Sequence, residues 1–176
     1  MCKLPKHLEK ILRVSEHDKT TMSGRIVCEC GCEKFGVKYF GEEMNEDGEE
    51  YPVLTAAEFD EKTALAVKAV CAECGMERLL FDFAKHGYDG LICGDGISVP
   101  DTELKTFTDG DEDDFKIEMT VEFDDEGQFL EEIVNDPPEG MSFTPDDRSD
   151  IWSWAVIELT GAKSGKKIKL VDEELA

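Results

Sequence analysis

Apolar and polar residues alternate along several short segments of the chain, which is the pattern of β-strands that bury one face. The longest such segment, residues 115–123, has apolar side chains at every second position: Phe115, Ile117, Met119, Val121 and Phe123. Shorter runs predict further strands: Lys34–Phe40, Thr63–Val70, Glu77–Asp82, Ser153–Thr160 and Lys167–Asp172. We expect Phe129–Val134 to be a returning strand, with a short helix as the alternative. The predicted fold class is mainly β, within the α+β class.

Three segments carry helix signals instead. Residues 5–18 begin with Pro5, which suits a first helical turn, and hold four residues at helical spacing: Leu8, Ile11, Leu12 and Ser15. Thr55 and Glu58 form a capping-box pattern, and Thr144 followed by Pro145 gives a similar helix start. We therefore expect an amphipathic N-terminal helix and one short helix in each half of the chain. Turns are predicted at Asn45–Gly48 and Asp125–Gly127.

The two halves of the chain match each other when the sequence is shifted along itself. A shift of 80 residues places Phe35 on Phe115 and Val37 on Ile117. A shift of 90 places Ala72, Gly75, Leu80 and Asp82 on Ala162, Gly165, Leu170 and Asp172. The order of strands, turns and helix caps repeats as well. We therefore predict a tandem duplication in four segments: an N-terminal helix in 1–22, a first unit in 23–84, a connector in 85–102 and a second unit in 103–176.

Two pairs of cysteines in the first unit have the spacing of a metal site. The pairs are Cys28 with Cys30 and Cys71 with Cys74, and a glycine directly follows the second cysteine of each pair. Zinc in structural sites takes four thiolate or imidazole ligands in a tetrahedron, and two short turns supply them in pairs. A cation also removes the repulsion between thiolates that are held close together. We expect these four residues to bind structural zinc, with Cys32 as an alternative ligand and iron as the less favoured metal.

These motifs resemble the zinc-ribbon family, and the likeness extends over both units, residues 25–82 and 105–172. The resemblance implies a three-stranded antiparallel sheet in each unit and a structural zinc held by two turns. The first cysteine pair is one residue shorter than the usual Cys-x-x-Cys, and 40 residues separate Cys30 from Cys71, which leaves room for an inserted hairpin and helix. The second unit has lost the ligands, and other residues stand in their places: Thr108, Gly110, Gly161 and Ser164.

The second unit needs another source of stability, because a structural zinc contributes on the order of 10 kcal/mol. Both tryptophans, Trp152 and Trp154, lie in this unit, and we expect them to enlarge its apolar core. An exposed tryptophan pair would instead mark a binding patch. Charged residues flank the lost ligands: Asp109, Asp111 and Asp113, then Lys163, Lys166, Lys167 and Lys169. The aspartates lack the pattern of an EF-hand calcium site, and the lysines either bind an acidic partner or pair with the acidic segment.

Charge is distributed very unevenly along the chain. Its 176 residues have a formal net charge of −23, and residues 101–150 hold 19 acidic side chains against three basic ones. Such a surface repels phosphate backbones and favours basic partners, and it is also a common kind of solvated face. No run approaches the roughly 20 apolar residues of a membrane span. Seven cysteines without an export signal predict reduced thiols and a cytoplasmic location.

The sequence holds no motif that identifies a substrate, such as a Ser-His-Asp set, a phosphate loop or paired catalytic carboxylates. We therefore expect a non-catalytic zinc-ribbon interaction or adaptor protein, not an enzyme, with a protein partner. Nucleic acid is disfavoured because glutamates flank the cysteines: Glu29, Glu33, Glu73 and Glu77. The alternative is an acidic protein of the immunity, antitoxin or nucleic-acid-mimic kind, which binds a basic partner. No role is predicted for Cys2 or Cys93.

Overall fold

Nine strands form one antiparallel sheet that dominates the structure, a computed structural model that describes residues 3–44, 51–123 and 128–175. The sheet follows the path β1-β2-β11-β3-β8-β9, while β10 pairs with β3, and β12 lies between β11 and β13. These strands are β1 (Leu12–His17), β2 (Thr21–Ile26), β3 (Phe35–Phe40), β8 (Ala66–Cys71), β9 (Glu77–Asp82), β10 (Lys105–Phe107), β11 (Phe115–Glu122), β12 (Trp154–Gly161) and β13 (Lys167–Glu174). The fold is therefore mainly β, and the strands expected at β3, β9, β11, β12 and β13 are confirmed.

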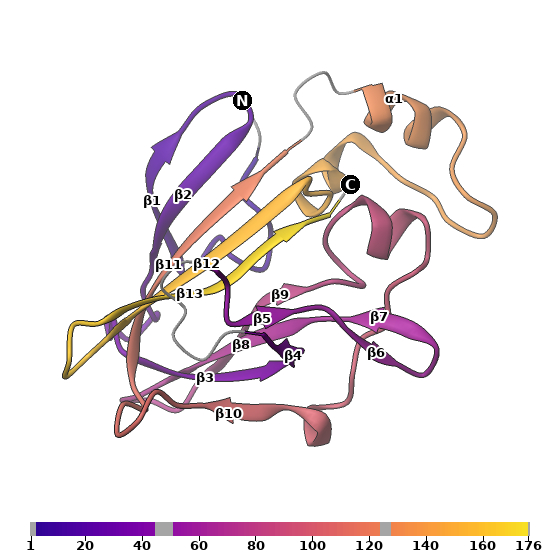
Figure 1. Cartoon of the computed structure of the whole chain (residues 1–176). Helices are drawn as coiled ribbons and strands as arrows, with labels where there is room; N and C mark the ends of the chain where they lie inside the picture. The colour runs from indigo at the N-terminus through magenta and orange to yellow at the C-terminus, as the bar shows by residue number, and fades with distance from the viewer. Residues whose placement is uncertain (1–2, 45–50, 124–127, 176) are drawn as a thin grey trace.

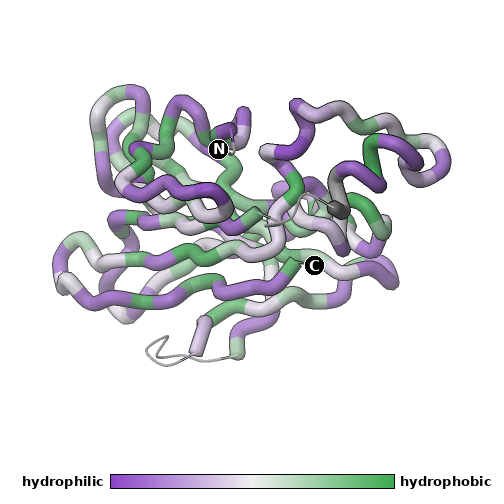
Figure 2. The backbone as a smooth tube through the Cα atoms, turned by 90° about the horizontal axis from the view of Figure 1, so that it is seen from above, coloured by the Kyte–Doolittle hydropathy of each residue, from purple (hydrophilic) through white to green (hydrophobic). Residues whose placement is uncertain are grey.

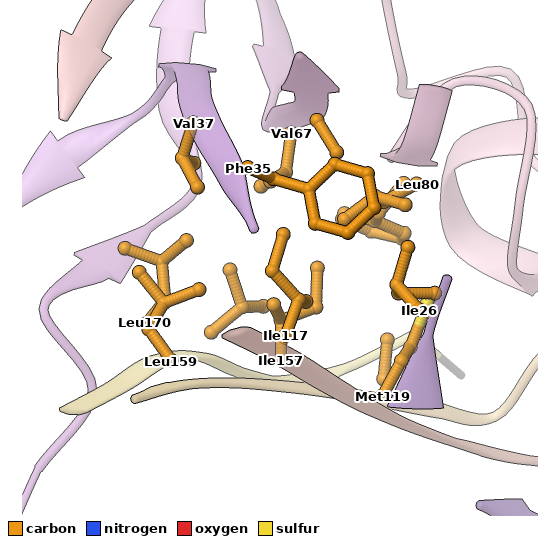
Figure 3. Close-up of a cluster of buried hydrophobic side chains, with 14 of the residues drawn as sticks. Ile26, Phe35, Val37, Val67, Leu80, Ile117, Met119, Ile157, Leu159 and Leu170 are labelled. Carbon is orange, nitrogen blue, oxygen red and sulfur yellow. The ribbon is translucent and has the colours of Figure 1, made fainter. Parts of the chain in front are cut away.

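The sheet curls so that its strands form two facing layers (Figure 1). One layer holds β1, β2, β11, β12 and β13, the other holds β10, β3, β8 and β9, and the backbone pair between Phe35 and Phe115 joins them. Hydrophobic and hydrophilic residues alternate along the strands (Figure 2), so that one face of each layer is apolar. The two apolar faces meet in a single core (Figure 3) that includes Ile26, Ile117, Met119, Ile157, Leu159 and Leu170 from the first layer and Phe35, Val37, Val67 and Leu80 from the second.

The same local geometry occurs in two three-stranded parts of the sheet, β3-β8-β9 and β11-β12-β13. Phe35 lies opposite Cys71 in the first part, and Phe115 lies opposite Gly161 in the second. These are the residues that the shifts of 80 and 90 match. The middle strand of each part also has a register shift at the matched position, between residues 67 and 68 and between residues 157 and 158. The two parts therefore share strand order, register and bulge.

In each half, the strand that leads into the first turn pairs with a strand of the other half. β2 precedes the first cysteine turn, yet it lies against β11, with Arg25 opposite Glu118. β10 precedes β11 along the chain, yet it pairs with β3, with Phe107 opposite Val37. The two halves therefore share one sheet and one core, and the expectation of a separate sheet in each unit is wrong.

Short elements surround the sheet, and one of them has the predicted helix start. They are β4 (Glu42–Glu43), β5 (Leu54–Thr55), β6 (Ala57–Phe59), β7 (Lys62–Ala64), η1 (Tyr88–Ile92), η2 (Asp101–Glu103), α1 (Gln128–Asn135) and η3 (Pro145–Asp150). At the start of η3, a 3-10 helix, the Thr144 amide donates a hydrogen bond to Asp147 Oδ2 over 2.7 Å. No helix among the described residues is long and apolar enough to cross a membrane.

The helix predicted over residues 5–18 is wrong. Residues 6–11 form turns in which the Leu12 amide donates to the Leu8 carbonyl, and β1 begins at Leu12. Leu8, Ile11 and Leu12 are buried in the core, so their apolar spacing was informative about burial. Beyond Leu12 the apolar stripe ends, and the backbone pairs with β2 instead. A short isolated helix is marginal in water, so strand pairing prevails there.

The helix expected after Thr55 is also wrong. Thr55 ends β5, and the chain continues as the β6–β7 hairpin, whose turn residues Asp60 and Glu61 have φ of 48° and 63°. Positive φ at both turn positions matches the twist of the paired strands, so the hairpin overrides the capping pattern. Residues 129–134 lie in α1, so the returning strand is wrong and the alternative helix is correct. The turns expected at 45–48 and 125–127 lie outside the described residues.

Candidate metal centre

Two neighbouring turns carry the cysteine pairs. The first follows β2, and there the Cys28 amide donates to the Cys32 carbonyl while the Gly31 amide donates to the Cys28 carbonyl, both over 2.8 Å. The second joins β8 to β9, and its Gly75 amide donates to the Cys71 carbonyl over 2.9 Å. Gly31 and Gly75 have φ of 92° and 71°, a region that favours glycine. The pairing of β3 with β8 brings the two turns together, since β3 follows one turn and β8 leads into the other.

Four cysteine sulfurs from these turns converge. The sulfurs of Cys28, Cys30, Cys71 and Cys74 all lie within 4.8 Å of one another. Those of Cys28 and Cys74 are 3.6 Å apart, and those of Cys30 and Cys71 are 3.5 Å apart. Four sulfurs placed tetrahedrally about 2.3 Å from a zinc ion lie about 3.8 Å from one another. The six described cysteines are free thiols, so the group can hold a metal ion and its spacing fits tetrahedral coordination.

The surroundings of the cluster favour ionisation of Cys71 over that of Cys28 and Cys30. Burial opposes ionisation of Cys71, but backbone amides, first that of Cys74, and the neighbouring thiols donate to its sulfur and lower its pKa to about 6. Burial raises the pKa of Cys28. At Cys30 the Cys32 amide favours the thiolate, yet the interaction with Cys71 raises its pKa to about 12. A bound cation would therefore be needed for several of these thiols to ionise together.

Cys32, the alternative ligand, lies apart from this group. Its side chain is buried, and its sulfur is 3.4 Å from the Lys34 amide nitrogen, which donates to it. Cys93 is exposed just beyond η1, and Cys2 lies outside the described residues. The four clustered thiols are thus the two pairs that glycine follows directly.

Basic side chains pair with most of the glutamates that flank the cysteines. The ion pairs are Arg78–Glu29, Lys10–Glu29, Arg25–Glu33 and Lys38–Glu77. Cys30 and Cys74 are themselves exposed. Exposed ion pairs contribute little to stability, so their main effect is to moderate the negative charge around the cysteine turns.

The acidic turn and the lysine strip of the second unit pair with each other. Lys163 Nζ lies 3.3 Å from Asp113 Oδ1, and Lys166 Nζ lies 3.1 Å from Asp109 Oδ2. This is the pairing alternative that the sequence offered for the lysines. Trp152 is buried in the core, as expected, whereas Trp154 is half-buried and donates its indole N–H to a carboxylate on β13.

A second group of titratable side chains lies where the N-terminal segment, the connector and η3 meet. Possible ligand atoms of His7, His86 and Asp150 lie within 4.8 Å of one another. The ring centroid of His86 lies 4.4 Å from that of His7 and 4.4 Å from that of Trp152, and the His7 and Trp152 centroids are 5.8 Å apart, so the three rings form a triangular cluster. Sequence analysis missed this group, because its members come from three segments that are distant along the chain and share no motif.

The geometry of this histidine pair does not suit metal chelation. The two rings are stacked within 14° of parallel, so their in-plane lone pairs do not converge on one ion. His86 Nδ1 accepts a hydrogen bond from the Asp82 amide over 3.0 Å, which leaves the proton of the neutral ring on Nε2. Burial lowers the pKa of His7 and His86 and raises the pKa of Asp150. Both histidines, His86 buried and His7 half-buried, therefore favour their neutral forms.

Neither protein-family models, nor curated proteins, nor solved structures match this chain. The likeness to zinc ribbons therefore rests on the cysteine turns and their geometry alone.

Proposed function

We propose that the chain is a non-catalytic interaction protein built on zinc-ribbon-type turns, with one structural zinc bound by Cys28, Cys30, Cys71 and Cys74. The observation that carries the proposal is the convergence of four sulfurs from two turns within 4.8 Å. Four thiolates in a closed tetrahedron leave no open coordination position, which is the arrangement of structural rather than catalytic zinc. Iron suits the same ligands and is the less favoured metal.

We also propose that residues 23–84 and 103–176 arose by duplication and that the second unit is the metal-free copy. Support comes from the shared strand order, register and bulge described above. The turns after the middle strands agree as well: the Cys71 amide donates to the Met76 carbonyl, and the Gly161 amide donates to the Lys166 carbonyl. Such agreement in hydrogen bonding is not required by the fold class alone.

A binding role is supported by the surface beside the cysteine turns. Cys30 and Cys74 are exposed, and Met76, which directly follows the second turn, is 44% exposed. A flexible, exposed apolar side chain gives a contact point for a protein. The flanking glutamates disfavour a nucleic-acid backbone. The proposed setting is the cytoplasm, where thiols stay reduced and available for metal.

An acidic cleft favours a second candidate function, the binding of a basic protein. The cleft, about 610 Å³ in volume, lies between η1 and α1. Its lining combines apolar and aromatic walls with carboxylates: Tyr88, Ile92, Glu131, Glu132, Ile133, Asn135, Asp136 and Pro138. None of these described lining residues is basic. An extended cationic side chain matches such a lining, so this candidate predicts a partner whose affinity falls steeply with salt.

Metal analysis of two serine variants tests the leading proposal. The purified protein should contain one zinc per chain, and Cys71→Ser should lose it, because that change removes one of the four ligands. Cys32→Ser is the matched control from the same pair of turns and should keep its zinc. Chelation should lower the melting temperature of the wild type and of Cys32→Ser, but not that of Cys71→Ser. A wild type without metal, or a Cys71→Ser variant with full zinc and unchanged melting, would refute the structural site. Visible absorption would instead identify iron.

Capture experiments separate the two candidate roles. A partner that binds through the cysteine turns should be retained by the wild type and lost by Cys71→Ser. A basic partner of the cleft should be retained by Cys71→Ser, released by salt and weakened by the double change Glu131→Gln with Glu132→Gln. A partner whose retention is unaffected both by Cys71→Ser and by the double glutamine change would contradict both candidates.

A further inference from the structure

One carboxylate of the second unit is buried and holds a turn in place. Glu112 is only 5% exposed, although it lies in the most acidic part of the chain. Its Oε2 accepts the Ser164 amide over 2.8 Å and the Lys163 amide over 3.1 Å, and its Oε1 lies 3.2 Å from the same Lys163 nitrogen. The hydrogen bond from Ser164 is the main cause that lowers the pKa of Glu112. The carboxylate is therefore an anion held by backbone donors of the 161–165 turn.

The matching amides of the first unit face a sulfur instead. In the turn after β8, the amides of Cys74 and Glu73 favour the thiolate form of Cys71 and so lower its pKa. The two turns are otherwise alike, because Gly75 and Gly165 have φ of 71° and 70°. Gly161 stands in the position of Cys71, and the carboxylate accepts the donors that the sulfur would otherwise use. In each unit, the matching pair of amides belongs to a turn beside a side chain that can carry negative charge.

A side chain at position 161 and the carboxylate of Glu112 exclude each other. A Cβ atom built on Gly161 would lie 2.7 Å from Glu112 Oε2 and 2.3 Å from Ser164 Oγ. The serine hydroxyl can rotate away, but the carboxylate is fixed by its amide donors. The missing cysteine at 161 and the presence of Glu112 are therefore two parts of one structural change.

We propose that the 161–165 turn is a carboxylate-binding site and that Glu112 is its resident ligand, in the position where the first unit presents a metal-binding thiolate. The ligand class follows from the donors, since adjacent backbone amides aimed at one point bind anions, and a carboxylate offers two acceptor oxygens to them. The inference deepens the proposed duplication, because it explains how the second unit keeps its turn closed without metal. The contacts of Glu112 described above are the evidence for this inference.

Replacement of the carboxylate tests the site directly. Glu112→Ala should lower the melting temperature by about 5 °C, because it leaves buried amide donors without an acceptor. Asp111→Ala removes an exposed carboxylate from the same acidic turn and should leave the melting temperature nearly unchanged. Sodium formate should raise the melting temperature of Glu112→Ala relative to sodium chloride at equal ionic strength, and should not do so for the wild type. Equal melting of the two variants, or equal effects of formate and chloride, overturns the proposal.

A double-mutant cycle gives a second measurement. Gly161→Ala should destabilise the wild type more than it destabilises Glu112→Ala, because the added methyl group meets the carboxylate only in the wild type. Additive effects would contradict the mutual exclusion. If Glu112→Ala does not fold, the wild type still decides: the Lys163 and Ser164 amide resonances must shift as the Glu112 carboxylate titrates, and resonances that stay fixed overturn the site.

Zinc content distinguishes this test from the test of the first unit. Glu112→Ala should keep the zinc of the first unit, so its loss of stability cannot be assigned to metal loss. A wild type without zinc would refute the proposed metal centre. The Glu112 measurements could still be interpreted, because they do not depend on the metal.

Discussion

Trp152→Ala should destabilise the chain far more than Trp154→Ala, although the two tryptophans are only two residues apart. Trp152 is 1% exposed, and its ring stacks on His86 at 4.4 Å and on Phe81 at 5.9 Å. Its indole N–H donates to the Ser149 carbonyl over 2.7 Å. The side chain therefore connects the end of η3 with the connector and with β9. Trp154 is only half-buried, so its removal leaves no comparable void.

The magnitude follows from the area that the indole buries. A buried tryptophan removes roughly 200 Å² from water, which corresponds to about 5 kcal/mol at about 25 cal/mol per Å². Alanine retains part of this area, and truncations of buried aromatic residues cost about 3–5 kcal/mol. We expect Trp152→Ala to lower the free energy of unfolding by about 4 kcal/mol. At about 2–4 °C for each kcal/mol, the melting temperature should fall by about 8–16 °C. Trp154→Ala should cost about 1 kcal/mol.

Urea unfolding followed by circular dichroism measures both variants, with Trp152→Phe as an intermediate that keeps an aromatic ring in the stack. A second readout is independent of stability. Trp152 covers His86, so its removal should raise the pKa of His86 towards the ordinary value of 6.5, as an NMR titration would report. Equal losses of stability for the two tryptophan variants, or an unchanged His86 titration in a folded Trp152→Ala, would refute this reasoning.

Acid and a single added methyl group give two further tests. Burial lowers the pKa of His7 and His86 in the folded chain, so the unfolded chain takes up protons first as the pH falls below about 6.5, and stability should decline between about pH 7 and pH 5. His86→Phe should make this decline shallower and the exposed control His17→Gln should not, as urea midpoints at each pH will show. Gly90→Ala should lower the free energy of unfolding by about 3 kcal/mol, because a Cβ atom there would lie 1.7 Å from the Phe83 carbonyl oxygen. Gly36→Ala is the control, since its nearest contacts lie at 3.9 Å, and equal melting of the two glycine variants would contradict the prediction.

The strands could be predicted because alternation is a local property of the sequence. Along β11, the apolar residues of the alternating pattern are the ones that the fold buries. The helix predictions failed where a local signal competed with pairing to a distant strand. The spacing of Leu8, Ile11 and Leu12 reports burial correctly, but the same spacing fits a turn that leads into an edge strand. At Thr55 the capping pattern is overridden by a hairpin whose turn adopts positive φ.

The cysteine cluster could be predicted because metal coordination links residue type to distance. Pairs of thiols beside glycine are informative even when 40 residues separate them. Glu112 left a weaker signal, since the shift of 80 places it on Cys32 but its neighbours are acidic too. Only the structure separates this buried carboxylate from the solvated ones around it. The stack of His7 on His86 left no signal, because ring contacts between distant segments have no sequence period.

The exchange of strands between the halves lay beyond sequence reasoning, and it changes what the metal would hold together. Alternation shows which face of a strand is buried, but not which neighbour completes its hydrogen bonds. Because β2 lies in one layer and β3 in the other, the turn with Cys28 and Cys30 is where the chain crosses between layers. The turn with Glu112 is the matching crossing from β10 to β11. A metal bound at the first crossing would therefore fix the connection between the two layers, in addition to stabilising its own turn. The hydrogen-bonded carboxylate of Glu112 would do the same at the second crossing.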